Sequence, residues 1–129
     1  MIYLDTSAAL KLVLPEAETQ RLELWLTERE GVPRVSSRLL RLEMLRAAAR
    51  TAPHRMSRAN VILSAVALLS IDDVAATAEA IGDSALRSLD AIHLATACEV
   101  RTGLTAFVCY DKRLCDSALT LGLPVESPA

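Results

Sequence analysis

Aromatic residues are scarce in this sequence: they make up 3% of its 129 residues, as one Trp, one Phe and two Tyr. Hydrophobic residues nevertheless amount to 52%, so the core must be built from Leu, Ala, Val and Ile. That composition suits Ala-rich helices covering a small buried sheet. At this length folding buries roughly two-thirds of the surface of the unfolded chain, and we expect one domain that spans residues 1–129.

The sequence also lacks paired cysteines, long apolar runs and a secretion signal. Its three cysteines, Cys98, Cys109 and Cys115, are odd in number and show no CxxC spacing, which speaks against a disulfide framework and a zinc site. The most apolar run, 61–69, has about half of the roughly 20 residues that a membrane crossing needs. The N-terminus has no basic start followed by a long apolar stretch and a cleavage site. We therefore expect a cytoplasmic protein without membrane contacts.

Short strand signals alternate with helical periodicity along the whole chain. This alternation predicts an α/β protein, a three-layer α/β/α sandwich with a short, mostly parallel five-stranded sheet. The expected strands are 2–4, 33–36, 68–71, 105–110 and 125–126, and the expected helices are 7–14, 15–30, 38–50, 56–67, 74–81, 86–99 and 112–121.

Two acidic residues follow predicted strands. Asp5 comes directly after the apolar run 2–4 and precedes two hydroxyl residues, and Asp111 comes after the strand at 105–110. Ligands bind outside the carboxyl ends of strands in a parallel α/β sheet, so acids at these positions are placed for chemistry. The alternative for Asp5 is an N-cap that satisfies free N–H groups of the next helix. Asp116, further along, either extends the acidic cluster or is simply exposed.

Two further acidic residues lie on apolar faces of predicted helices. Glu43 sits in a Leu/Ala stripe, and a buried carboxylate needs a cation, a proton or hydrogen bonds. Two partners are possible for the Glu43 carboxylate: Arg46, in an ion pair, or a metal ion. Asp90 shares a helix face with His93, and Ser88 is expected to cap that helix. We expect His93 to be a satisfied core residue rather than a base or a ligand.

These four acids meet in one cleft if the helices lean over the carboxyl edge of the sheet. Clustered carboxylates repel one another unless divalent cations neutralise them. Oxygen ligands without Cys or close His pairs select Mg²⁺ or Mn²⁺ over zinc. Such a site acts on phosphates through a metal-activated water, and no Gly-rich phosphate loop indicates use of a nucleoside triphosphate.

Positive charge is concentrated between residues 34 and 58, although the net charge of the chain is −2. This segment contains seven arginines and a single acidic residue, Glu43. A phosphate backbone recognises this kind of charge, which makes Arg38, Arg41 and Arg46 candidate contacts to RNA or to a partner. A solvated helix face, or a surface that pairs with an acidic protein, would show the same pattern.

Four stretches stand in a specific order and spacing: MIYLDTSAAL at 1–10, the lone Glu43 in its Leu/Ala helix, LRSLDAIHLA at 86–95 and YDKRL at 110–114. With these stretches the chain resembles, over almost its whole length, the PIN-domain ribonucleases, and specifically the VapC toxins of bacterial toxin–antitoxin pairs. The resemblance places the family's acidic quartet on Asp5, Glu43, Asp90 and Asp111. It also matches Thr6 or Ser7 to the hydroxyl position that orients the first acid or its metal.

The resemblance implies a single PIN-like nuclease domain at 1–129 and Mg²⁺- or Mn²⁺-dependent endonucleolytic cleavage of RNA. It further implies growth arrest, a homodimer and inhibition by a cognate VapB-type antitoxin that sends an Arg into the acidic cleft. One departure is Cys109, because relatives often carry Thr or Ser there. This difference puts in doubt a supporting hydrogen bond near Asp111. His93 matches a common helix residue of the family that is not part of the quartet.

Two other functions are compatible with parts of the pattern. A PIN-like module that keeps the fold and binds proteins without cleaving RNA would be separated from a nuclease by metal binding. A phosphatase of the haloacid dehalogenase type also has an Asp after its first strand. That site needs a second acid two residues further on, where this chain has Ser7.

Overall fold

The computed structural model describes residues 1–129 and contains one five-stranded parallel sheet. The strands are β1 (Ile2–Leu4), β2 (Arg34–Ser37), β3 (Ala67–Leu69), β4 (Ala106–Val108) and β5 (Val125–Glu126). Their spatial order is β3-β2-β1-β4-β5, and every pairing is parallel. The five predicted strands are all present, and β1 lies at the centre of the sheet.

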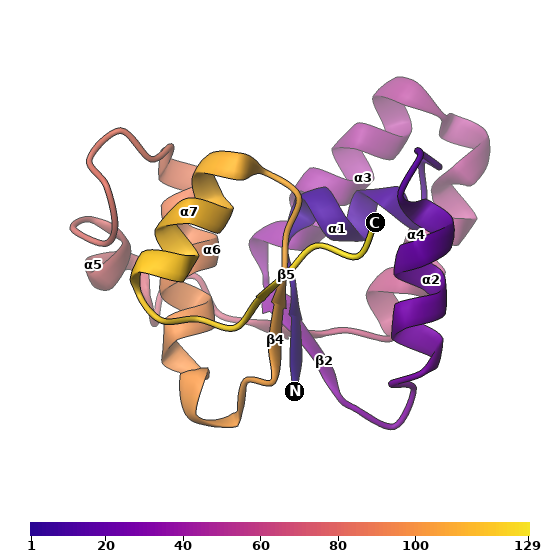
Figure 1. Cartoon of the computed structure of the whole chain (residues 1–129). Helices are drawn as coiled ribbons and strands as arrows, with labels where there is room; N and C mark the ends of the chain where they lie inside the picture. The colour runs from indigo at the N-terminus through magenta and orange to yellow at the C-terminus, as the bar shows by residue number, and fades with distance from the viewer.

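Helices cover both faces of this sheet, which confirms the predicted three-layer α/β/α sandwich (Figure 1). The helices are α1 (Thr6–Lys11), α2 (Thr19–Thr27), α3 (Leu39–Thr51), α4 (Met56–Ser64), α5 (Ala75–Ala78), α6 (Ser88–Glu99) and α7 (Lys112–Thr120), with two 3₁₀ turns, η1 (Pro53–Arg55) and η2 (Arg101–Gly103). Helices α1 to α4 lie on one side and α5 to α7 on the other. None of them combines the length and the apolar character that a membrane crossing requires.

Alternate side chains of the central strands enter two separate cores. Ile2 and Leu4 of β1 pack with α1 to α4, whereas Tyr3 packs with α6, α7 and Phe107 of β4. This division follows from the strand period of two, which turns successive side chains to opposite faces. The rings of Tyr3 and Phe107 stack with 5.2 Å between their centroids. Two of the four aromatic residues thus pack where two neighbouring strands meet.

Helix α1 ends at Lys11, short of the predicted 7–14. The Thr19 hydroxyl donates to the last helical carbonyl, that of Lys11, at 2.8 Å, and helix ends need such partners for their free carbonyls. Just past the helix, Arg58 donates to the carbonyl oxygen of Leu12, with 3.1 Å between Nε and O, and Arg55 donates to that of Val13 at 3.3 Å. Part of the arginine-rich segment is therefore structural.

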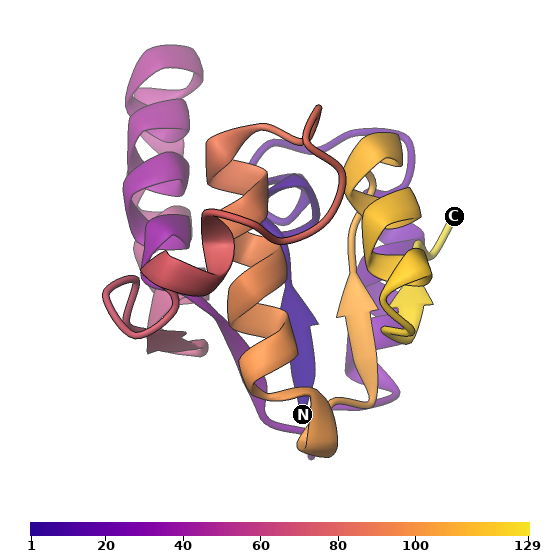
Figure 2. The same ribbon diagram turned by 90° about the vertical axis from the view of Figure 1, so that its left-hand side faces the viewer.

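The strand order reverses between β1 and β4. The chain leaves β1 toward β2 and β3, then crosses over the sheet to β4 and continues to β5. Ligand sites of open parallel sheets form outside the carboxyl ends of the strands at such a switch point. Asp5 follows β1 directly and Asp111 follows β4 by three residues. Helix α6 begins at the same end of the sheet (Figure 2).

Candidate functional site

Asp5 is both the N-cap of α1 and part of the candidate site. Its Oδ2 accepts hydrogen bonds from the backbone N–H of Ser7 at 3.1 Å and from the Ser7 hydroxyl at 2.7 Å. The Asp5 side chain is only 4% exposed. Its Oδ1 accepts no hydrogen bond from the chain and lies 3.9 Å from Nε2 of His93. The predicted capping role is confirmed, and it occupies only one of the two carboxylate oxygens.

Ser7 connects this acid to the end of β4. Its Oγ accepts a hydrogen bond from the backbone N–H of Tyr110, with 2.9 Å between Oγ and N. Cys109 is fully buried at this point, and its thiol lies 3.5 Å from the carbonyl oxygen of Asp111. Burial raises the pKa of the Cys109 thiol, so the side chain stays neutral. Support next to Asp111 therefore comes from Ser7 as well as from Cys109.

Glu43 of α3 is held by two side chains from other elements. The Thr6 hydroxyl donates to Oε1 at 2.7 Å, and Nε2 of His93 lies 2.9 Å from the same oxygen. Burial acts to raise the pKa of Glu43, but these hydrogen bonds outweigh it and keep the pKa below its ordinary value. Of the two open interpretations, the ion pair with Arg46 is wrong: Arg46 is exposed and forms no ion pair.

His93 is a buried residue as expected, but its partners belong to the candidate site. The ring is 1% exposed and contacts Glu43, Thr6 and, through Nδ1, the hydroxyl of Tyr3 at 2.8 Å. Burial acts to lower the pKa of His93, but the hydrogen bond to Glu43 and the charge of Asp5 raise it above the usual range. The spacing of His93 three residues after Asp90 was the signal in the sequence that pointed toward the acids.

Asp111 is the N-cap of α7 and follows β4, whereas Asp5 follows β1 on the other side of the switch point. Its Oδ1 accepts a hydrogen bond from the backbone N–H of Leu114 at 3.0 Å, and its Oδ2 accepts none from the chain. Asp111 is exposed, unlike Asp5. Asp116 is exposed as well and pairs with Lys112 at 2.9 Å. Asp116 is thus committed to a surface ion pair on α7 and does not act on the carboxylates of the site.

The pKa of Asp90 is affected by the charges of the other three acids. It lies in the first turn of α6, and its side chain accepts no hydrogen bond from the chain. Burial raises the pKa of Asp90, and the negative charges of Asp5 and Asp111 raise it further, with a smaller effect from Glu43. The predicted N-cap Ser88 is wrong: α6 begins at Ser88, and the cap position, Arg87, makes no side-chain cap. Asp90 thus remains uncommitted within the acidic cleft.

The carboxylate oxygens that accept no hydrogen bond are the atoms of the four acids that could bind a cation. Asp5, Glu43 and Asp111 each have one oxygen fixed by the protein and one without a hydrogen bond, and both oxygens of Asp90 are without one. No three acidic, Cys or His side chains stand close enough to hold one ion together. An all-oxygen donor set of this kind fits Mg²⁺ or Mn²⁺, because Mg²⁺ keeps several waters and needs only one or two protein carboxylates.

The arginine-rich segment divides into bonded and free residues. Arg34, like Arg55 and Arg58, donates to a backbone carbonyl, here that of Leu26 at 3.4 Å. The three candidate contact residues, Arg38, Arg41 and Arg46, are exposed and form neither ion pairs nor side-chain hydrogen bonds. They surround an apolar groove of about 490 Å³ along α3.

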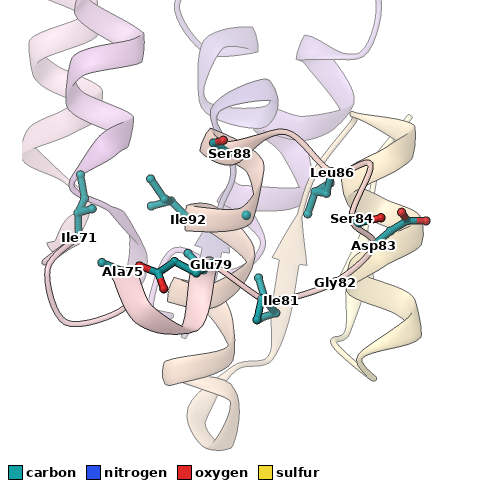
Figure 3. A pocket seen from close by; sticks show the side chains of 13 residues that line it. Ile71, Ala75, Glu79, Ile81, Gly82, Asp83, Ser84, Leu86, Ser88 and Ile92 are labelled. Carbon is teal, nitrogen blue, oxygen red and sulfur yellow. The ribbon is translucent and has the colours of Figure 1, made fainter.

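A second hollow, of about 480 Å³, lies between α5, the segment 79–88 and α6 (Figure 3). Ser88, Ala91 and Ile92 line it from α6. Helical geometry places these positions on a different face from Asp90 and His93. The hollow is therefore separated from the carboxylates by the body of α6.

The sequence and the fold were compared with known proteins. The model of the PIN domain family matches residues 2–118. The chain is 43% identical over 132 residues to ribonuclease VapC47 of Mycobacterium tuberculosis (strain CDC 1551 / Oshkosh), covering 99% of this chain and 97% of that one. It is 41% identical over 131 residues to ribonuclease VapC35 of the same strain, with the same coverage of both chains.

Two solved structures share the fold at low sequence identity. One is Mycobacterium tuberculosis VapC20, described as a toxin that cleaves the Sarcin-Ricin loop, with a TM-score of 0.74, 16% identity and coverage of 99% of this chain and all of that one. The other is VapBC2 from Rickettsia felis bound to a DNA fragment from their promoter, with a TM-score of 0.69, 12% identity and full coverage of both chains.

Proposed function

Because this chain belongs to the PIN domain family, we propose that it is a metal-dependent endoribonuclease that acts as the toxin of a toxin–antitoxin pair. The observation that carries the proposal is the position of Asp5 and Asp111 after β1 and β4, with Thr6 and His93 linking Glu43 to the same edge of the sheet and Asp90 three residues before His93. Burial raises the pKa of Asp90, and the negative charges of Asp5 and Asp111 add to this effect, which supports their proximity. Ribonuclease is also the activity by which the similar VapC proteins are named.

In this proposal one or two of the four carboxylates at a time would bind Mg²⁺, or Mn²⁺ in its place, and waters would complete the coordination. A divalent cation there supplies positive charge and activates a water for hydrolysis of the RNA phosphodiester bond. The Ser7 hydroxyl fixes Asp5, and the Thr6 hydroxyl fixes Glu43. Side chains held in this way bind the substrate complex without reorganising, which is the main advantage of a preformed polar site.

The test is cleavage of end-labelled RNA by the purified protein in Mg²⁺, in Mn²⁺ and in EDTA. We expect cleavage in either metal and none in EDTA. Asp90→Asn removes one charge at almost constant volume and is expected to abolish cleavage, whereas Asp116→Asn, an acid outside the site, is expected to cleave as wild type does. Equal activity of a folded Asp90→Asn variant would contradict the assignment of the quartet.

We also propose that the chain forms a homodimer and is inhibited by a cognate VapB-type antitoxin. Support for an antitoxin comes from the VapBC2 assembly among the structures that share the fold. Support for self-association comes from apolar surface: Leu42 is 58% exposed within the groove along α3. Leu42→Glu is expected to shift the molecular mass in solution from dimer to monomer. Val61→Glu, at a similarly exposed apolar site on α4 (60%), is the matched control and should remain dimeric.

The two alternative functions are less well supported by the site. A phosphatase of the haloacid dehalogenase type needs an acid at position 7, where Ser7 is fully engaged in holding Asp5 and the end of β4. A protein-binding module without catalysis has no use for a half-buried Asp90 repelled by neighbouring carboxylates, because such repulsion only lowers stability. An Mn²⁺-binding isotherm separates the nuclease from the module.

A further inference from the structure

We propose that His93 is a positioning residue: its ring holds Oε1 of Glu43 so that Oε2 is the one oxygen of Glu43 left to bind a cation. The inference rests on the proposed function and concerns the same site. It starts from the contrast between the four acids. Glu43 lies past the first turn of α3, which begins at Leu39, so it does not cap the free N–H groups of its own helix.

The other fixed acids have such groups. Asp5 and Asp111 cap α1 and α7, and each accepts a hydrogen bond from a backbone N–H of its own helix. The first N–H groups of a helix are without partners and orient a capping carboxylate. Inside a helix every N–H is already bonded, so a mid-helix carboxylate needs side chains instead. For Glu43 these side chains are Thr6 and His93.

The orientation of the imidazole ring is set by Tyr3. The backbone N–H of Ser37 donates to the Tyr3 hydroxyl oxygen at 3.1 Å, which leaves the phenolic hydrogen free to be donated. Nδ1 of His93 lies 2.8 Å from that oxygen. Nδ1 accepts the phenolic hydrogen when the ring is neutral and donates to the phenolic oxygen when the ring is protonated, and in both states the ring carries a hydrogen on Nε2.

The contacts of Nε2 require the same assignment. Oε1 of the ionised Glu43 is an acceptor only, and it lies 2.9 Å from Nε2. The oxygen of Thr6, whose hydrogen is given to Oε1, lies 2.9 Å from Nε2 as well. A hydrogen on Nε2 is thus shared between two oxygens, whereas a bare Nε2 would face two lone pairs. Both ring nitrogens of a side chain that is 1% exposed are satisfied in this way.

The consequence is a continuous chain of hydrogen bonds from β2 to Glu43. It runs from the Ser37 N–H through the Tyr3 hydroxyl and the His93 ring to Oε1 of Glu43. The Tyr3 ring is itself fully buried and stacked on Phe107, so the chain is anchored in the core. Partners behind a metal-binding side chain typically change metal affinity by 10- to 100-fold when they are removed.

The first test is the ¹⁵N NMR spectrum of the His93 ring in the wild-type protein. We expect a hydrogen on Nε2 that correlates through its bond to nitrogen. A ring that carries its only hydrogen on Nδ1 would overturn the inference. This measurement needs neither metal nor RNA, so it tests the hydrogen-bond chain even if the proposed ribonuclease function fails.

The second test compares His93→Leu with His93→Gln by titration with Mn²⁺ followed by electron paramagnetic resonance. Leu keeps the bulk and has no donor, and we expect Mn²⁺ affinity to fall by about 10- to 100-fold. The side-chain amide of Gln offers an N–H near the position of Nε2 and is expected to recover most of the affinity. Wild-type affinity in a folded His93→Leu variant would show that His93 only packs.

Tyr3→Phe provides a third variant should His93→Leu not fold. It keeps the stacked ring but removes the hydroxyl that fixes Nδ1, and we expect a smaller loss of Mn²⁺ affinity than with His93→Leu. Unchanged affinity and an unchanged ring spectrum in Tyr3→Phe would contradict the role of the hydrogen-bond chain. If the wild-type protein itself binds no Mn²⁺, the proposed function fails, and the ring spectrum alone decides the present inference.

Discussion

The hydroxyl of Ser7 accepts a hydrogen bond from the backbone N–H of Tyr110, with 2.9 Å between Oγ and N, across 103 positions of the sequence. Through the same hydroxyl Ser7 donates to Oδ2 of Asp5 at 2.7 Å. One side chain therefore joins the carboxyl ends of β1 and β4, the two strands between which the acids gather. This link makes the geometry of the cleft sensitive to a single hydroxyl group.

Ser7→Ala is expected to lower both stability and activity. It leaves the N–H of Tyr110 without its partner and frees Oδ2 of Asp5 from its shortest bond, which together should lower the free energy of unfolding by about 1–3 kcal/mol. Urea denaturation measures this loss, and RNA cleavage should fall at least tenfold. Ser57→Ala, an exposed serine of α4, is the control and should match wild type in both measurements.

Asp90→Asn is expected to stabilise the metal-free protein while it abolishes cleavage. At neutral pH the ionised Asp90 is repelled by Asp5 and Asp111, and an amide relieves that repulsion at almost the same volume. We expect Tm in EDTA to rise by roughly 2–4 °C, a shift that a modest gain in stability gives in a domain of this size. A Tm that falls in EDTA would show that the charge of Asp90 is compensated within the protein.

Comparing the wild type with Asp90→Asn in the presence of metal distinguishes the effect of repulsion from that of metal binding. A ligand that binds only the folded state raises Tm as its concentration increases. Mg²⁺ or Mn²⁺ should therefore raise the Tm of the wild type and of Asp116→Asn, and should have a much smaller effect on Asp90→Asn. Equal metal-dependent shifts in all three proteins would place the cation elsewhere.

Much of this architecture was predictable because strand and helix periods are local properties of a sequence. The five strands, their parallel sheet and the position of Asp5 after β1 followed from apolar runs and the residues that end them. The ends of helices were less predictable, since the turn that follows α1 is bonded at its carbonyls by Arg55 and Arg58 from 42 and 46 positions away. No local pattern contains such a contact.

The interior of the site shows the same limit. Glu43 was recognisable as an acid on an apolar face, but its partner was sought one turn away, at Arg46. The actual partners are Thr6 and His93, which are 37 and 50 positions distant. Tyr3 was assigned to the core as an apolar strand residue, and its hydroxyl could not be linked to His93 before the fold placed β1 beside α6. Long-range hydrogen bonds between buried side chains are decided by topology.

Lys11 is expected to stabilise the segment between α1 and α2. It is buried, pairs with Glu16 at 2.8 Å and with Glu18 at 2.9 Å, and lies 4.7 Å from the centroid of the Tyr110 ring. Lys11→Met keeps the apolar stem and removes these interactions, and we expect Tm to fall by roughly 3–6 °C. Lys112→Met, which breaks only the exposed pair with Asp116, should leave Tm unchanged, because exposed ion pairs contribute little.

The stability difference between wild type and Lys11→Met should depend on pH. The hydrogen bond from Lys11 holds the pKa of Glu18 below its ordinary value of 4.5, so this contribution is complete above that value and is lost as the pH falls through the pKa in the folded state. Burial acts to lower the pKa of Lys11, but the two glutamates raise it above 10.5. The contribution is therefore present below that pH and lost above it. A difference that stays constant from pH 3 to pH 7 would contradict the pairing.

Arg38, at the N-cap of α3, and Arg41 and Arg46 within it are expected to contact the RNA backbone. Changing Arg38, Arg41 and Arg46 together to Ala should weaken RNA binding and flatten its dependence on salt, because each phosphate contact that is lost lowers the slope of log K against log salt by about 0.7–0.9. Filter binding at several salt concentrations measures the slope. Arg41→Ala and Arg21→Ala provide a comparison at equal charge, since Arg21 is exposed on α2, and only the change in α3 should lower the slope. If the triple variant keeps the slope of wild type, these arginines contact the antitoxin or the second subunit instead of RNA.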